Sequence, residues 1–368
     1  MSDFNQLVVE SAAKQFTLEG DIISVQPFGS GHINDTYRVV TTVDSGISHL
    51  LQRINHHVFP NVDGLMHNIE LVTKHLSKKV KVAEGKRISD HVLTIVPTRD
   101  GKLYIKDIQE NYWRMFILIE DTKSYDIVET EVQAAEGGRA FGLFQKQLSD
   151  LDASLIVEVL PNFHNIEFRL ENLRKAIAKD VCQRVELVKD KLDFIFNRED
   201  RMKTILELGS KGKLPLRITH NDTKFNNVLL DSHDKMQCVI DLDTVMPGYV
   251  AYDFGDAIRT IINPVAEDEQ DISKIILNLA LYKAYAEGYL EEANDFLTTL
   301  EKETLVDGAF LLPYMQGVRF LTDYLEGDHY YKTKYEDHNL VRTNTQLKLV
   351  EEMEKNEAFM RKVVFDSI

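Results

Sequence analysis

RITHNDTKFNNVLLD, residues 217–231, is the most informative stretch of this sequence. Its polar centre runs from His220 to Asn227 and fits the pattern His-x-Asp-x-x-x-x-Asn, with Asp222 as the acid. A second acid, Asp241, follows fourteen residues after Asn227, at the end of a short apolar run. The two patterns place an acid and an amide on one loop and another carboxylate at the end of the next strand.

The spacing of these side chains has a physical reason. Phosphoryl transfer uses a carboxylate that accepts the proton of a hydroxyl, and oxygen ligands for the Mg²⁺ that neutralises a triphosphate. Asp222 is placed to be the base, and Asn227 and Asp241 are placed to be the metal ligands. Mg²⁺ keeps several waters, so one carboxylate and one amide oxygen suffice. The alternative is an ordinary polar turn between two strands, which the position of Asp241 disfavours.

A glycine-containing loop near the N-terminus supports this interpretation. The stretch FGSGHINDTY, residues 28–37, lies between two predicted strands and carries Gly29, Ser30 and Gly31. Glycines allow backbone amides to approach phosphate oxygens closely. An ordinary hairpin loop is the alternative, and the absence of Gly-Lys-Ser/Thr excludes a Walker A loop.

The lysine that a kinase usually carries on its third strand is missing. No Lys lies between Lys14 and Lys74. Alternation along HLLQRI puts Arg53 on a strand face where it can take the lysine's position, with Glu70 or a neighbouring residue as its partner. The alternative is an exposed strand arginine.

The order of the patterns predicts two lobes. Strand patterns before residue 121 lie at 21–28, 36–42, 49–54, 91–98, 103–107 and 111–121, with a helix at 64–76. Helical repeats follow at 131–148, 186–197, 204–208, 272–289, 307–326 and 345–357, interrupted by a β-type island at 216–245. We expect an α+β fold with a small β-rich nucleotide-binding lobe at 1–120. A large helical catalytic and acceptor-binding lobe should span 121–368.

Composition limits the partners. The chain has 368 residues and a net charge of −16, so we expect no nucleic acid and no anionic membrane as partner. The two cysteines, Cys182 and Cys238, are predicted to be buried free thiols. The longest apolar run, about 309–315, is too short to span a membrane. The N-terminal stretch lacks a basic region, so we expect a cytosolic protein without a signal peptide.

Two other motifs suggest different chemistry. DLDTVM, residues 241–246, is similar to the nucleophile loop of haloacid-dehalogenase-type phosphatases, although that motif normally opens its domain. DFG at 253–255 is similar to the magnesium loop of protein kinases. Because Asp241 already occupies the metal-ligand position, we expect Asp253 to brace the catalytic loop instead.

The chain resembles the aminoglycoside phosphotransferase and choline kinase superfamily, which has a protein-kinase-like bilobal fold, and within it the N-acetylhexosamine 1-kinases. The similar segments are FGSGHINDTY, NVDGLMHNIELV, LRITHNDTKFNNVL, VIDLDTVMPG, DFGDAIR, RFLTDYLEGDHYY and HNLVRTNTQLKLVEEME, between residues 26 and 354.

This resemblance implies ATP- and Mg²⁺-dependent phosphorylation of the anomeric hydroxyl of N-acetylglucosamine or N-acetylgalactosamine. It implies Asp222 as base, Asn227 and Asp241 as Mg²⁺ ligands and Asp243 as an additional ligand or support. The residues that it implies for the nucleotide are Gly29–Gly31 for phosphate and the backbone of Ile117–Glu120 for adenine. Those that it implies for the sugar are His32, Asn221, Arg319 and Tyr330.

Three alternatives stay open. An aminoglycoside or choline kinase has the same fold, and a charge of −16 suits a cationic acceptor even better than a neutral sugar. A phosphatase would use Asp241 as its nucleophile. An inactive nucleotide-binding module is suggested by the missing lysine.

Overall fold

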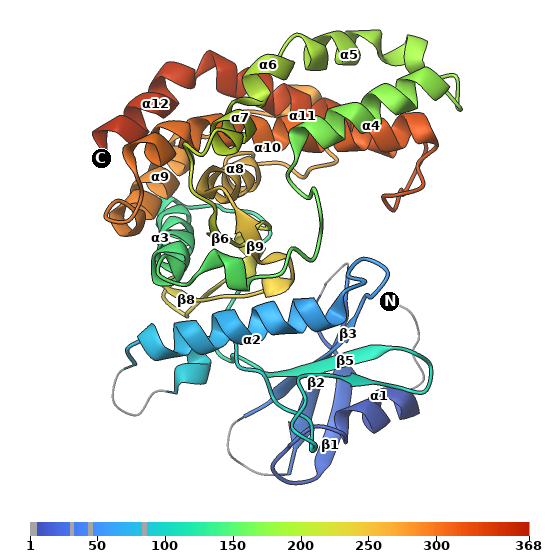
Figure 1. Ribbon diagram of the computed structural model, residues 1–368, viewed down its shortest axis with the longest axis vertical. Coiled ribbons are helices and arrows are strands. Elements are labelled where there is room, and N and C mark those ends of the chain that lie inside the picture. Colours follow the sequence, from blue (N-terminus) through green and yellow to red (C-terminus); the bar gives the residue numbers. More distant parts are fainter. Residues whose placement is uncertain (1–5, 30–32, 43–46, 83–86, 368) are drawn as a thin grey trace.

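The chain folds into a small part built on one β-sheet and a larger part built mainly of helices (Figure 1). The computed structural model describes residues 6–29, 33–42, 47–82 and 87–367. The predicted α+β class is confirmed.

The sheet of the N-terminal part has five antiparallel strands in the order β1-β2-β3-β5-β4. The strands are β1 (Ile22–Pro27), β2 (Asp35–Thr41), β3 (His49–Ile54), β4 (Ile105–Lys106) and β5 (Tyr112–Ile117). The register of β3 and β5 pairs Gln52 with Arg114 and Arg53 with Trp113. Because successive side chains point to opposite faces, Gln52 and Arg114 share one face and Arg53 and Trp113 the other.

A helix covers each face of this sheet (Figure 1). α2 (Val62–Lys79) lies on the face towards the larger part, where Leu65 joins a buried cluster with Phe116 of β5. α1 (Gln6–Ala13) lies on the opposite face, beside a second cluster that contains Trp113. The face that carries Arg114 is therefore the one turned towards the rest of the molecule.

The strand predicted at residues 91–98 is wrong. This segment makes isolated bridges, such as Ile95 with Phe116, instead of a continuous ladder. β4 already pairs with part of the same edge of β5. Pro97 also has no N–H to donate to a ladder. The segment therefore follows β5 with single contacts only.

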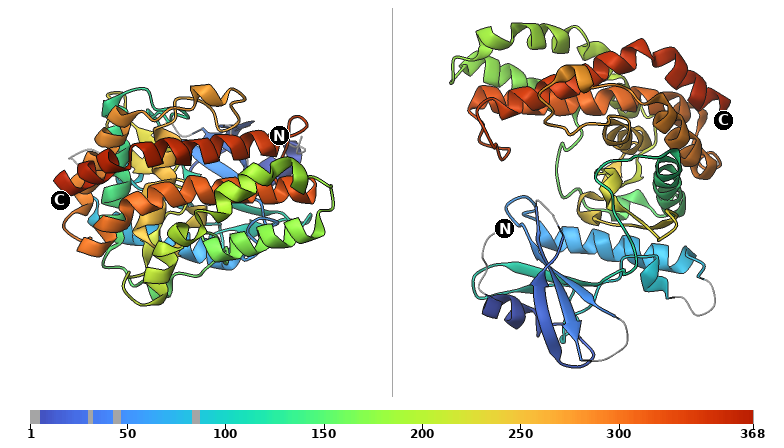
Figure 2. Two further views of the ribbon diagram at one scale, coloured as in Figure 1. Left: turned by 90° about the horizontal axis from the view of Figure 1, so that it is seen from above. Right: turned by 180° about the vertical axis from the view of Figure 1, so that it is seen from behind.

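The larger part consists of ten α-helices and two small sheets in the described residues. The helices are α3 (Glu131–Leu148), α4 (Ile166–Lys179), α5 (Lys189–Phe196), α6 (Glu199–Met202), α7 (Thr204–Ser210), α8 (Val250–Ile261), α9 (Leu279–Ala293), α10 (Thr299–Glu326), α11 (His338–Lys355) and α12 (Glu357–Asp366). The sheets pair β6 (Arg217–Thr219) with β9 (Met246–Gly248) and β7 (Val228–Leu230) with β8 (Met236–Val239). Figure 2 shows α10, α11 and α12 at the end of the molecule farthest from the sheet.

Glycines let α8 and α10 pack with their backbones in contact. A Cβ atom on Gly255 would overlap the carbonyl of Gly308, and one on Gly308 would overlap the carbonyl of Ala251. Only glycine permits this approach. The contact fixes α8, whose first turn carries Asp253, against the long helix α10.

The helix predicted at 272–289 begins later than expected. Residues 272–274 form a single 3₁₀ turn, and α9 begins at Leu279. Asn278 caps α9, because its side-chain oxygen accepts a hydrogen bond from the Leu281 amide at 3.2 Å. The apolar spacing continues across the cap, which is why the pattern predicts one longer helix.

Candidate active site

The loop from His220 to Asn227 connects β6 to β7 and is held from below by Asp253 of α8. The carboxylate of Asp253 accepts hydrogen bonds from the backbone amides of His220 at 2.8 Å and Asn221 at 2.7 Å. Thr223 donates its hydroxyl to the Asp253 carbonyl at 2.6 Å. Burial raises the pKa of Asp253, and these amide donors oppose the rise. The prediction that Asp253 braces the loop is confirmed.

The side chain of Asn221 is used inside the loop. Its amide nitrogen donates to the Thr244 carbonyl at 3.0 Å, and its oxygen accepts from the Thr219 hydroxyl at 3.1 Å. Asn221 has a φ of 64°, so the backbone turns sharply just before Asp222. The structure thus gives Asn221 a role in shaping the loop, whereas the predicted sugar contact stays a prediction.

Asp222 lies between a cation and an amide. One carboxylate oxygen is 2.9 Å from the Lys224 ammonium. Asn227 donates its side-chain amide to the Asp222 carbonyl at 2.8 Å and to the second carboxylate oxygen at 3.3 Å. Burial alone would raise the pKa of Asp222, but the positive charges of Lys224, His220 and Arg259 hold it below its ordinary value. Asp222 is therefore ionised at neutral pH.

Asp241 follows β8 and is brought next to this loop. The backbone amide of Ile240 donates to the Asn227 carbonyl at 2.9 Å, and the His220 ring contacts the Ile240 carbonyl at 2.8 Å. Asp241 itself is exposed. The protein around its carboxylate and the like charges of Asp243 and Asp222 still raise its pKa to about 7. A divalent cation at this position would relieve that repulsion.

Asp243 links the two parts of the molecule. Its carboxylate is 2.5 Å from the guanidinium of Arg114 on β5 and accepts a hydrogen bond from Asn34 at 2.8 Å. Arg114 also donates to the Gln52 side chain at 3.0 Å. Both Arg114 and Asp243 are almost completely buried, at 2% and 5% side-chain exposure. The sheet thus supplies a cation close to the acidic loop.

The expected role of Arg53 is not supported. Arg53 points to the face opposite Arg114 and donates to Asp35 at 2.7 Å and to Asn111 at 3.3 Å. Glu70 pairs with Lys74 at 2.7 Å instead of with Arg53. The predicted Arg53–Glu70 pair is wrong, because strand alternation places Gln52, not Arg53, on the side of α2.

Arg114 was missed by sequence reasoning. The available signal was one arginine inside the otherwise apolar run WRMFILI. A buried cation on a strand needs a buried partner, but the partner lies 129 residues further along the chain at Asp243.

The predicted nucleotide-contact residues lie in two places. Gly29 has a φ of 74°, which favours glycine, whereas Ser30, Gly31 and His32 lie outside the described residues. At the end of β5, the Ile117 amide already donates to the Thr94 carbonyl at 2.9 Å. The Glu120 carboxylate pairs with Arg38 at 2.5 Å. The backbone groups of Glu120 make no hydrogen bond within the described parts of the chain.

Arg319 of α10 and Tyr330 of the turn after it both lie against Tyr331. The Arg319 guanidinium carbon is 5.7 Å from the ring centre of Tyr331, whose ring contacts that of Tyr330 at 4.8 Å. The Asp323 carboxylate accepts hydrogen bonds from the backbone amides of Tyr330 at 2.8 Å and Tyr331 at 3.0 Å. These bonds fix the turn after the helix. The Tyr330 side chain is left 73% exposed.

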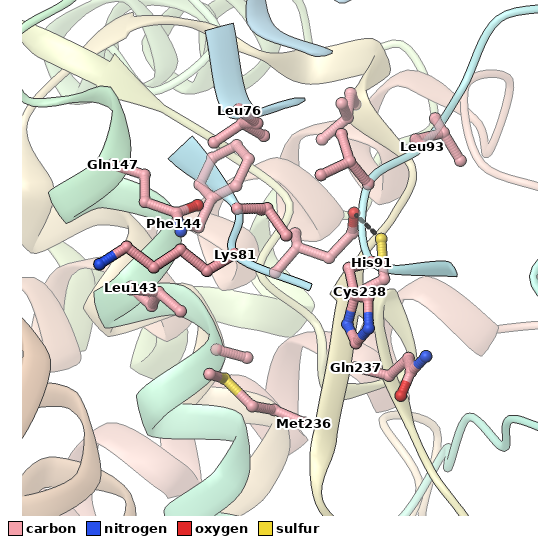
Figure 3. A pocket seen from close by; sticks show the side chains of 15 residues that line it. Leu76, Lys81, His91, Leu93, Leu143, Phe144, Gln147, Met236, Gln237 and Cys238 are labelled. Atoms are coloured by element: carbon pink, nitrogen blue, oxygen red, sulfur yellow. Dashed lines mark hydrogen bonds between the residues drawn. The ribbon is translucent and has the colours of Figure 1, made fainter. Parts of the chain in front are cut away.

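A separate cavity of about 240 Å³ lies behind this site, between the end of α2, α3 and β8 (Figure 3). Leu76, Phe144, Met236 and Cys238 contribute to its largely apolar wall. Burial raises the pKa of the Cys238 thiol to about 12. Both cysteines are free, but Cys182 is exposed, so the prediction that both are buried is wrong for Cys182.

The fold and the site together define a kinase-like phosphotransferase. Residues 24–295 match the family described as the phosphotransferase enzyme family (APH), and the chain belongs to this family. No helix within the described residues is long and apolar enough to cross a membrane.

Solved structures with the same fold cover nearly the whole chain. A microcompartment-associated aminopropanol kinase is 15% identical with a TM-score of 0.59, over 97% of this chain and 98% of that one. A spectinomycin phosphotransferase bound to ADP and spectinomycin is 12% identical with a TM-score of 0.58, over 100% and 99%. A choline kinase from Cryptosporidium parvum is 14% identical with a TM-score of 0.54, over 96% and 97%. The protein-kinase-like bilobal fold is therefore confirmed.

Proposed function

We propose that this protein transfers the γ-phosphoryl group of ATP to the anomeric hydroxyl of an N-acetylhexosamine. The product would be the 1-phosphate of N-acetylglucosamine or N-acetylgalactosamine. The observation that carries the transfer reaction is the contact of Asp222 with Asn227, next to Asp241, on a loop that Asp253 holds in place. The choice of an N-acetylhexosamine rests on the sequence resemblance.

Asp222 is the proposed catalytic base. Its lowered pKa keeps it ionised, and one of its oxygens can accept the proton of the sugar hydroxyl as the oxygen attacks phosphorus. Lys224 lies 2.9 Å from the other oxygen, where it orients the carboxylate and balances its charge. The remaining acceleration comes from in-line alignment of the two substrates.

Asn227 and Asp241 are the residues that would hold Mg²⁺. The Asn227 nitrogen is bonded to Asp222, so its amide oxygen is left for a metal. Asp241 provides a carboxylate whose pKa is raised by desolvation and then by the negative charges of Asp243 and Asp222. Bound Mg²⁺ would neutralise the charge of the triphosphate. Asp243, already engaged by Arg114 and Asn34, fits the role of support better than that of ligand.

The ATP would lie between residues 1–120, the proposed nucleotide-binding lobe, and the proposed catalytic and acceptor-binding lobe of 121–368. Gly29, Ser30 and Gly31 would cover the phosphates, and the free backbone groups of Glu120 support an adenine contact there. Arg114 replaces Arg53 in this proposal as the cation of the sheet, because it faces the acidic loop. Sugar contacts are proposed for His32, Arg319 and Tyr330.

A kinase for cationic acceptors is the main alternative, since two of the relatives reported above are a spectinomycin phosphotransferase and a choline kinase. The phosphatase alternative is not supported, because Asp241 lies inside the region that matches the phosphotransferase family. The buried Arg114 weakens the argument for an inactive module, which rested on a missing cation.

The test is ADP release with Mg²⁺-ATP over N-acetylglucosamine, N-acetylgalactosamine, glucose, choline and kanamycin, with phosphorus NMR of each product. We expect a sugar 1-phosphate from the acetylated sugars. Turnover with choline or kanamycin alone would overturn the sugar assignment and retain the kinase. ATP binding without ADP release for any compound would contradict the proposed reaction.

A further inference from the structure

Two arginines without carboxylate partners lie side by side next to the catalytic loop. Arg169 of α4 donates to the Phe163 carbonyl at 2.9 Å, and Arg319 of α10 donates to the Gln316 side-chain oxygen at 3.1 Å. Neither forms an ion pair with a carboxylate of the described residues. By contrast, Arg259, which is also mostly buried, pairs with two acids.

The two guanidinium groups both contact Phe163, one through its carbonyl and the other through its ring. Arg319 lies 5.7 Å from the ring centre of Phe163, the residue whose carbonyl Arg169 binds. Burial, and then the positive charge of Arg319, lower the pKa of Arg169 to about 10. Like charges held together without a counterion are costly, and such arrangements concentrate at functional sites.

Arg169 also has a donor that nothing satisfies. Its Nε atom is buried and makes no hydrogen bond within the described residues. A buried donor without an acceptor is costly, and an incoming acceptor atom would recover that cost.

The arginine pair is linked to the loop of the proposed base through Phe163 and His164, and burial and both arginines lower the pKa of His164. His164, the residue after Phe163, contacts the Asn221 carbonyl through its ring nitrogen at 3.1 Å. Asn221 is followed by Asp222. The pair therefore lies close to the residue that precedes the proposed base.

The acids nearest to the pair are engaged by cations, although the whole chain carries −16. Asp222 is matched by Lys224 at 2.9 Å. Asp256 and Glu267 both pair with Arg259, at 2.7 and 3.0 Å. These three acids and two cations leave a single negative charge, and Asp241 lies beside Asp222 as a further acid. Overall composition favours a cationic acceptor, but the two arginines themselves would repel one.

We propose that Arg169 and Arg319 form a subsite that binds a carbonyl or carboxylate oxygen of the acceptor and rejects amine cations, with Arg169 as a specificity-determining residue. A guanidinium presents parallel N–H donors that suit such oxygens. The acetamido carbonyl of an N-acetylhexosamine is an acceptor of this kind. A quaternary amine or an aminoglycoside would meet two like charges instead. This inference rests on the proposed kinase function of the site.

The test measures acceptor binding separately from turnover. Isothermal titration calorimetry with Mg²⁺ and AMP-PNP present would give the Kd of N-acetylglucosamine, glucuronate, choline and kanamycin. The variants are Arg169→Gln and the control Arg174→Gln, an arginine of the same helix that is 43% exposed and pairs with Glu199. An unchanged Kd for AMP-PNP would show that each variant is folded.

In the wild type, we expect the acetylated sugar or the sugar acid to bind at least about tenfold more tightly than choline or kanamycin. Arg169→Gln should weaken the binding of that acceptor roughly 10- to 100-fold, and Arg174→Gln should leave it unchanged. Tighter binding of a cation, no binding of either oxygen-rich acceptor, or an unchanged Kd in Arg169→Gln would overturn the inference.

The two proposals can fail separately. Binding and phosphorylation of glucuronate alone would retain the arginine subsite and remove the N-acetylhexosamine assignment. Turnover of N-acetylglucosamine by Arg169→Gln with an unchanged KM would retain the assignment and remove the subsite.

Discussion

The catalytic loop and the arginine pair differ in how their polar groups are satisfied. In the loop, Asp253 binds two backbone amides and Asn221 binds two neighbouring groups, so the conformation is fixed before any ligand arrives. At the pair, no described residue accepts from the Arg169 Nε or places a carboxylate against either guanidinium. The loop has a conformation that its own hydrogen bonds fix, whereas the hydrogen bonds and charges of the arginine pair would be satisfied by a bound ligand.

The largest effect should come from loosening the loop. Asp253→Ala leaves buried amides without an acceptor, so we expect the free energy of unfolding to fall by about 3 kcal/mol and kcat to fall at least about 100-fold. Urea unfolding measures the free energy of unfolding, and ADP release measures kcat. Asp295→Ala, a change at an 86% exposed side chain, should alter neither. A normal kcat in Asp253→Ala would show that the loop geometry does not depend on this brace.

The metal ligands give the next largest effect. Asp241→Asn removes the exposed carboxylate that would bind Mg²⁺, so the Mg²⁺ concentration for half-maximal activity should rise roughly 10- to 100-fold. Asp231→Asn, before the turn that joins β7 and β8, is the matched control. An unchanged Mg²⁺ dependence of the Asp241 variant would count against its role.

A smaller effect is expected when arginines on the two faces of the N-terminal sheet are replaced. Arg114→Met should raise the KM for ATP about tenfold, because it removes the cation next to the acidic loop. Arg53→Met, on the opposite face, should leave the KM for ATP unchanged. Arg114→Lys should recover part of the effect. Equal effects of the Arg114 and Arg53 variants on KM would contradict the assignment of faces.

The smallest effect concerns the thiols of Cys182 and Cys238, which should differ in their reactivity. Cys182 is exposed and should react with Ellman's reagent within minutes at pH 8. Cys238, buried and with a pKa raised to about 12, should react only after unfolding, and its reaction should stay slow up to about pH 10. Rapid titration of two thiols in the folded protein would contradict the burial of β8.

Local spacing was enough to predict some features and not others. Asp222, Asn227 and Asp241 lie on adjacent loops of one short segment, so their proximity follows from the sequence. Arg114 could not be assigned, because its partner Asp243 belongs to the other part of the chain. Arg169 and Arg174 both lie in α4, and the sequence gives no reason to single out one of them. Only the packing of α4 against α10 distinguishes them.

Secondary structure shows the same division. The helix at 131–148 agrees with α3, because its apolar repeat is regular. α8 was not predicted, since nearly all of its residues are buried and the DFG motif falls within its first turns. The division of function at residue 120 and the roles of Ser30, Gly31 and His32 stay predictions.

The most direct test of the whole account is the turnover of Asp222→Asn. This change keeps the size and the hydrogen-bonding shape of the side chain but removes the proposed base. We expect an unchanged unfolding midpoint, an unchanged affinity for AMP-PNP, and a kcat lower by at least about 100-fold. A folded Asp222→Asn variant that releases ADP at a near-normal rate would contradict the account.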